Sequence, residues 1–174
     1  TLPKLTGKLY AGIKFSTDGT SCALAVACRT KDNAIFVEAI GCHPTRDGSG
    51  WLLDFLSKAD LAAVAVDGAS GQQLLADAMK AAHLRSPVLP TVKQVITANA
   101  AFEQALFAQA LCHAGQPGLA QAASNCEKRA IGSNGGFGYR SLTEGGHIEL
   151  LDSVILAHWQ CAEGKGKRRQ RIRY

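Results

Sequence analysis

The stretch LYAGIKFSTDGTSCALAVAC, residues 9–28, decides the fold of this chain. One apolar strand runs into the turn STDG and a second apolar strand leaves it, which is typical of a β-hairpin. The first strand ends at Lys14, at a place where several folds that carry out phosphate chemistry need a carboxylate. The chemistry available to the chain therefore depends on what surrounds this lysine.

The pattern around this hairpin predicts an α/β fold. Three strands with short connections should form an antiparallel meander, and strands then alternate with helices, which adds parallel strands and flanking helices to a mixed sheet. The expected strands are 8–15, 20–30, 34–41, 62–68 and 87–90. The expected helices are 48–59, 70–84 (capped by Ser70), 97–115 and 147–164, with a short helical stretch at 119–128 and a hairpin at 129–141 around Asn134-Gly135.

Three ionisable residues are expected to share one pocket. Asp67 ends a wholly apolar strand, which is typical of a central strand, and the right-handed crossover rule puts it beside the strand that ends at Lys14. Sites in open α/β sheets gather at the carboxyl ends of strands. Asp152 joins the other two if the last helix packs across that edge. Asp18, His147 and Glu149 are accessory candidates.

Two carboxylates beside a third position suit Mg²⁺ or Mn²⁺, which prefer oxygen ligands. Two such ions about 4 Å apart can activate a water molecule and stabilise the leaving oxygen of a phosphodiester. Simpler roles stay open: Asp67 as a turn residue before Gly68, Asp152 as part of a solvated helix face, and Asp18 as a residue that serves its own turn.

The composition indicates a globular protein without a membrane span. Hydrophobic residues make up 47% of the 174 residues and charged residues 19%, and the chain holds no apolar run of about 18 residues. The first eight residues have no apolar signal-peptide core, so we expect a protein that is not secreted. The six cysteines form no Cys-x-x-Cys pair, which favours reduced thiols over a zinc site or a disulfide framework.

The positive charge is concentrated at the C-terminal end. The net charge is +5, yet residues 1–163 carry 13 basic and 14 acidic groups, or −1. We therefore divide the chain into one domain over 1–163 and a basic arm over 164–174, which can attract DNA through counterion release or can be a solubilising terminus. The candidate DNA-binding residues are Lys165, Lys167, Arg168, Arg169, Arg171 and Arg173.

Four segments carry a resemblance to a known family: GIKFSTDGTSCALAVA, AAVAVDGASGQQLLADAMK, HAGQPGLAQAASNCEKRAIGSNGGFGYR and LLDSVILAHW. From about residue 9 to 160 the chain resembles the nuclease domain of the large terminase subunit of tailed bacteriophages, which has an RNase H-like fold. The resemblance implies an endonuclease that uses two Mg²⁺ or Mn²⁺ ions to cut concatemeric double-stranded viral DNA in the host cytoplasm. It also implies three partners: an ATPase domain of the same subunit, a portal and a small terminase subunit. No G-x-x-x-x-G-K-[ST] motif occurs here, so the ATPase part is expected outside these residues.

The chain departs from the family at the first acid. Asp67 matches the acid after the central strand and Asp152 the acid on the final helix, but the pattern Gly-Ile-Asp-Phe-Ser has Lys14 in place of its aspartate. An ammonium cannot bind a metal ion, so we expect Lys14 to pair with Asp67 and Asp152 and to leave a folded but catalytically impaired site. Two origins of the lysine stay open, engineering to abolish cleavage, which we favour, and natural variation.

Two other functions compete with the nuclease. One is a DNA-binding module of the packaging motor without enzymatic activity. The other is a lobe of an actin-like ATPase, whose first hairpin holds phosphate in an Asp-Gly-Thr turn, although 174 residues are few for a protein of two lobes.

Overall fold

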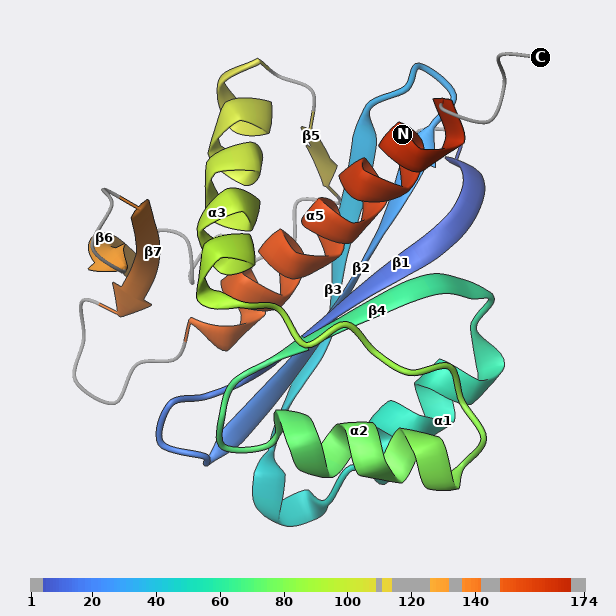
Figure 1. Cartoon of the computed structure of the whole chain (residues 1–174), viewed down its shortest axis with the longest axis vertical. Coiled ribbons are helices and arrows are strands. Elements are labelled where there is room, and N and C mark those ends of the chain that lie inside the picture. The colour runs from blue at the N-terminus through green and yellow to red at the C-terminus, as the bar shows by residue number, and fades with distance from the viewer. Residues whose placement is uncertain (1–4, 109–110, 114–125, 132–135, 142–147, 170–174) are drawn as a thin grey trace.

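The fold is a five-stranded mixed sheet with helices on both faces (Figure 1). The computed structural model describes residues 5–108, 111–113, 126–131, 136–141 and 148–169, with side chains at 7–108 and 148–164. The strands of the sheet lie in the order β4-β1-β2-β3-β5. They span Leu5–Phe15 (β1), Ser21–Thr30 (β2), Ile35–Pro44 (β3), Leu61–Asp67 (β4) and Leu111–His113 (β5). The helices are α1 (Gly50–Lys58), α2 (Gln72–Ala81), α3 (Val92–Phe107) and α5 (Glu149–Arg169).

The sheet confirms the predicted fold class. β1, β2 and β3 form the expected antiparallel meander, β4 pairs with β1 in parallel, and β5 pairs in parallel with β3. Because β4 lies next to β1 in this register, Lys14 stands directly opposite Asp67. This mixture of antiparallel and parallel strands is the RNase H-like arrangement that the sequence predicts.

Alternation along β1 separates two hydrophobic cores. Ala11, Ile13 and Phe15 are buried on the face that α1 and α2 cover. Tyr10 and Gly12 lie on the opposite face, where α5 and α3 pack. Because side chains alternate along a strand, Lys14 shares the face of Gly12 and therefore the side of α5.

The α5 helix crosses β1 at Gly12. A Cβ atom on Gly12 would lie 2.2 Å from the carbonyl oxygen of Ser153 and 2.5 Å from the backbone nitrogen of Ala157. Further along, Gly164 makes the same kind of contact with the Tyr10 hydroxyl. The helix therefore runs antiparallel to β1, with its first turn toward the carboxyl end of the strand.

The expected helix over 97–115 is wrong at both ends. It begins five residues earlier, because Thr91 and Gln94 form a capping box through hydrogen bonds of 2.9 and 3.2 Å. It ends at Phe107, and residues 111–113 are the strand β5. Pairing with β3 overrides the helical pattern there.

Two shorter elements also differ from the prediction. Residues 87–90 form one isolated bridge, Val88 to Ala65, because the flanking prolines have no N–H to continue a ladder. The end of the helical stretch expected at 119–128 belongs instead to strand β6 (Cys126–Ile131), which pairs with β7 (Gly136–Ser141). That pairing confirms the predicted hairpin, although its turn at Asn134-Gly135 lies outside the described residues.

The last helix extends beyond the predicted end at residue 164. α5 continues to Arg169, so the first part of the basic arm is helical. His147 precedes the helix and lies outside the described residues. Four cysteines, Cys22, Cys28, Cys42 and Cys161, are free thiols, as expected. Within the described ranges, no helix is both long and apolar enough for a membrane span.

Candidate functional site

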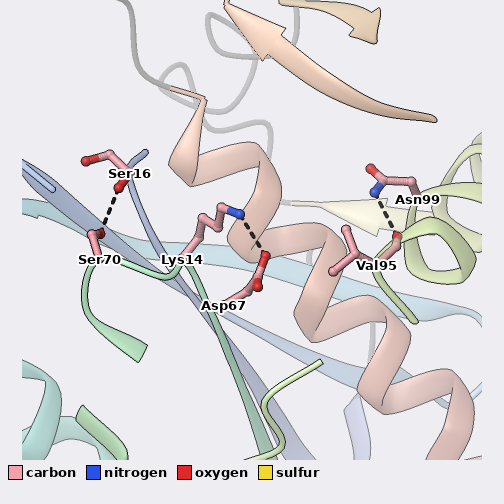
Figure 2. A network of polar contacts seen from close by, with 6 residues as sticks. All are labelled: Lys14, Ser16, Asp67, Ser70, Val95 and Asn99. Carbon is pink, nitrogen blue, oxygen red and sulfur yellow. Dashed lines mark hydrogen bonds and ion pairs between the residues drawn. The ribbon is translucent and has the colours of Figure 1, made fainter. Parts of the chain in front are cut away.

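Lys14 and Asp67 form an ion pair at the carboxyl ends of β1 and β4. The Lys14 Nζ donates to Asp67 Oδ2 over 2.7 Å, and Figure 2 shows the two side chains pointing toward one another. The side chains are 20% and 18% exposed, so both charges are largely removed from water. A charge pair in such a place attracts strongly because the surroundings screen it poorly.

Among the acids whose side chains the structure describes, Glu149 is the most enclosed at this end of the sheet. It lies in the first turn of α5 and is 6% exposed, and its Oε2 accepts a hydrogen bond from Ser21 Oγ over 3.1 Å. Ser21 begins β2 and is joined to Ser16, just beyond the end of β1, by two hydrogen bonds of 2.9 and 3.0 Å. Glu149, an accessory candidate in the sequence, therefore reaches the strand ends.

Asp152 lies one turn further along α5 and is half-buried. It precedes Ser153, whose carbonyl oxygen stands over Gly12, two residues before Lys14 on β1. This crossing brings the backbone of Asp152 to the same side of the sheet as the ion pair. That the Asp152 carboxylate also pairs with Lys14 stays a prediction.

Asp18 stabilises the turn between β1 and β2, which is the simpler of the two roles that the sequence left open for it. Its Oδ1 accepts hydrogen bonds from Ser16 Oγ (2.8 Å), the Thr20 backbone N–H (3.0 Å) and Thr20 Oγ1 (2.7 Å). The Ser70 hydroxyl, predicted to cap α2, instead donates to the Ser16 carbonyl over 2.9 Å (Figure 2), and Gly71 takes the N-cap position without a side-chain bond. These serine contacts were not predicted, because the only sequence signal of the serines is their position beside turns.

The thiols near Glu149 are not reactive groups. Burial raises the pKa of Cys22 to about 12, and the neighbouring Cys42 and Glu149 raise it further in the same direction. Burial and Glu149 also raise the pKa of Cys42. Both thiols therefore stay protonated and are poor metal ligands or nucleophiles at neutral pH.

His158 is a core residue of α5. It is 3% exposed and meets the edge of the Phe102 ring at 5.5 Å between ring centroids. Burial, with a smaller effect of Arg29, lowers the pKa of His158 to about 4. The side chain is therefore neutral in the folded protein at physiological pH.

A divalent metal ion does not fit this site as it stands. In the part of the chain that the structure describes, no three His, Cys, Asp or Glu side chains gather closely enough to hold one. The Lys14 ammonium also occupies Asp67 Oδ2, one of the oxygens that the resemblance assigns to the metal. The Mg²⁺ or Mn²⁺ expected from that resemblance therefore has a cationic side chain in its place.

The candidate DNA-binding residues fall at the other end of α5. Residues 165–169, which carry Lys165, Lys167, Arg168 and Arg169, form the last turns of that helix. Arg171 and Arg173 lie outside the described residues. These last turns lie beyond Gly164, which packs on Tyr10, so about half of α5 separates them from the Lys14–Asp67 pair.

No family model and no curated protein matches the sequence. Among solved structures, the chain is similar to the large terminase of bacteriophage HK97, with a TM-score of 0.69 at 15% identity over 91% of this chain. It is similar to the large terminase nuclease of thermophilic phage G20c, with a TM-score of 0.60 at 15% identity, over 91% of this chain and 92% of that one. The chain has the fold of large-terminase nuclease domains. This confirms the fold that the resemblance implied.

The terminase-nuclease fold is also close to that of a cellular protein. The yeast mitochondrial Holliday junction resolvase Ydc2 matches with a TM-score of 0.53 at 13% identity, over 98% of this chain and 85% of Ydc2. A second G20c nuclease structure, with bound magnesium, has a TM-score of 0.56. The chain spans 40% of the length of the HK97 large terminase.

Proposed function

We propose that this chain is the nuclease domain of a viral large terminase, an endonuclease for concatemeric double-stranded DNA, and that Lys14 keeps it inactive. The fold supports the nuclease part of the proposal. The Lys14–Asp67 ion pair at the carboxyl ends of β1 and β4 supports the inactive part. This is the edge of the sheet where α/β proteins commonly place their reacting groups.

The ion pair is the observation that carries the proposal. A lysine at the end of a central strand is costly unless an acid compensates it, and here Asp67 does so at 2.7 Å. The ammonium supplies the positive charge that a metal ion would bring, but it offers no site for water or phosphate oxygen. The chain is thus expected to fold without Mg²⁺ or Mn²⁺, to bind DNA and to leave it uncut.

The first experiment restores the missing acid. Lys14→Asp should convert plasmid DNA to nicked and linear forms in Mn²⁺, whereas the unchanged protein and Lys14→Asn should not, because Asn removes the charge without adding a carboxylate. Adding Asp67→Ala to Lys14→Asp should abolish the cleavage. Lys58→Asp, at an exposed position on α1, is the matched control and should leave DNA intact.

A non-enzymatic DNA-binding module is the second candidate. The poor fit of the site to a metal ion favours it. It predicts that Lys14→Asp protein binds DNA but cuts none at any Mn²⁺ concentration, which is the result that would overturn the nuclease proposal.

The assembly follows from the same proposal. Because the chain spans 40% of the HK97 large terminase, an ATPase domain of the same subunit is its first proposed partner. A portal, a small terminase subunit and double-stranded viral DNA complete the proposed packaging machine. Its place of action would be the host cytoplasm during virus assembly.

A further inference from the structure

A cavity of about 590 Å³ lies between α3, α5 and the edge strand β4. It is well separated from the Lys14–Asp67 pair, because Tyr10 and Gly164 line it and these residues lie at the far end of the β1–α5 contact. Its volume is within the range of pockets that hold small molecules. It is thus a concave site apart from the Lys14–Asp67 pair.

The wall of the cavity holds a side-chain amide that has no hydrogen-bond partner among the described residues. Gln160 is 7% exposed and lines the cavity, and no hydrogen bond to its side chain occurs among the described residues. The neighbouring Trp159, 5% exposed, also lines the cavity, and its indole N–H has no partner there either. The Gln160 amide is not enclosed by protein, so it can pair with a ligand in the cavity that carries both donor and acceptor atoms.

Two opposite charges stand at the cavity on different helices. Lys93 is in the first turn of α3 and Glu163 is on α5, and both are exposed. The ion pairs found in the described ranges involve neither residue. The cavity therefore offers one cation and one carboxylate to a ligand.

We propose that this cavity binds a nucleotide. The apolar wall of Ala62, Ala63 and Val88 suits a flat ring, and a glutamine amide matches the paired donor and acceptor on the edge of a base such as adenine. Lys93 would take the phosphate, and Glu163 would accept hydrogen bonds from sugar hydroxyls or an exocyclic amine. A purely apolar ligand would leave Gln160 unpaired, and a bare anion would meet Glu163 without using the amide.

Two kinds of ligand would present these groups to the cavity: a free mononucleotide and the terminal nucleotide of a DNA strand. The probes are therefore deoxyadenosine monophosphate, deoxyadenosine, inorganic phosphate and a short single strand with a 5′-phosphate. The inference does not depend on the proposed nuclease activity, because Gln160, Lys93 and Glu163 are distinct from the residues of the ion pair.

The indole N–H of Trp159 is the reporter. The chain has two tryptophans, and Trp51 packs on His43 on the other face of the sheet, so Trp51→Phe leaves one indole signal in a ¹⁵N-labelled protein. We expect the monophosphate to shift that signal in a saturable way with a Kd below about 1 mM, more tightly than the nucleoside or phosphate alone. Tighter binding of the 5′-phosphorylated strand would assign the site to a strand end, and tighter binding of the monophosphate to a free nucleotide.

Two variants and two controls complete the test. Gln160→Leu and Lys93→Gln, each made in the Trp51→Phe protein, should weaken binding about tenfold or more. Lys93 is exposed, so its variant should fold normally. Lys58→Gln and Lys80→Gln, at exposed positions on α1 and α2, should leave the binding affinity unchanged. The proposal would be overturned by the absence of a saturable shift with any nucleotide at about 10 mM. It would also be overturned if both cavity variants bound the nucleotide as tightly as the Trp51→Phe protein, or if glycylglycine bound and no nucleotide did.

Discussion

At the scale of single residues, the fold tolerates Lys14 because of its partner. The Lys14 side chain is 20% exposed at the strand end, and the Asp67 carboxylate replaces part of the stabilisation that water would give the ammonium. Replacing only Asp67 should therefore lower the free energy of unfolding more than replacing both Lys14 and Asp67.

This imbalance can be measured with a double-mutant cycle in urea. We expect Asp67→Asn to lower the free energy of unfolding by about 2 kcal/mol, because it leaves a charge without a partner at a poorly solvated position. Adding Lys14→Met should recover most of that loss, which gives a coupling energy of about 1–2 kcal/mol.

The exposed pair Lys58–Asp54 on α1 provides the control for this cycle. Its N–O distance is 2.9 Å, but its side chains are 75% and 62% exposed, so its coupling should be about 0.5 kcal/mol or less. Equal coupling energies for the two pairs would show that the position of Lys14 has no special electrostatic character.

At the scale of elements, the site depends on how closely α5 approaches β1. Gly12→Ala would place a methyl group 2.2 Å from the Ser153 carbonyl oxygen, so the helix or the strand must move. We expect a loss of about 2–3 kcal/mol in the free energy of unfolding, measured in urea. Gly50→Ala, where the added Cβ meets nothing within 4 Å, is the control and should be neutral. Equal stability of the two variants would contradict the close approach.

The packing of α5 also makes stability depend on pH. The pKa of His158 is about 4 in the folded protein, against 6.5 for an ordinary histidine, because burial disfavours the charged ring. As the pH falls from 6.5 toward 4, the unfolded chain takes up a proton that the folded chain does not, so His158 should destabilise the fold by up to about 3 kcal/mol.

Comparing variants isolates this contribution. In His158→Gln, unfolding monitored by fluorescence between pH 7 and 4 should show a smaller loss of stability than in the unchanged protein. His43→Gln, at an exposed position on β3, should keep the full loss. An unchanged pH profile in His158→Gln would refute the burial argument.

The sequence contained enough to predict the meander and the position of β4, because hairpin turns and crossover handedness are local or general rules. The sequence also contains the Thr91–Gln94 capping box that starts α3. The prediction of a start at residue 97 overlooked this signal. It could not reveal β5, a strand of three residues whose conformation depends on pairing with β3. Nor could it rank Glu149 above Asp152 in burial, since this depends on how α5 is rotated over the sheet.

At the scale of the whole molecule, the excess positive charge is concentrated at the C-terminal end of the chain. Residues 1–163 have a net charge of −1, and the six basic residues of the arm lie at and beyond the end of α5. Replacing these six with glutamine should weaken DNA binding and flatten the slope of log K against log salt by up to about 5, because fewer counterions are released. The measurement is fluorescence anisotropy with duplex DNA between about 50 and 200 mM salt. The same slope in both proteins would exclude the arm as the DNA contact.

The proposed function depends most on the place of Lys14 at the reacting end of the sheet. The most direct test is anomalous diffraction from Mn²⁺-soaked crystals of the unchanged protein and of Lys14→Asp. We predict no manganese peak beside Asp67 in the first, and in the second a peak about 2.1–2.2 Å from a carboxylate oxygen of Asp67. A manganese peak beside Asp67 with Lys14 present, or none there in Lys14→Asp, would contradict this role of the lysine.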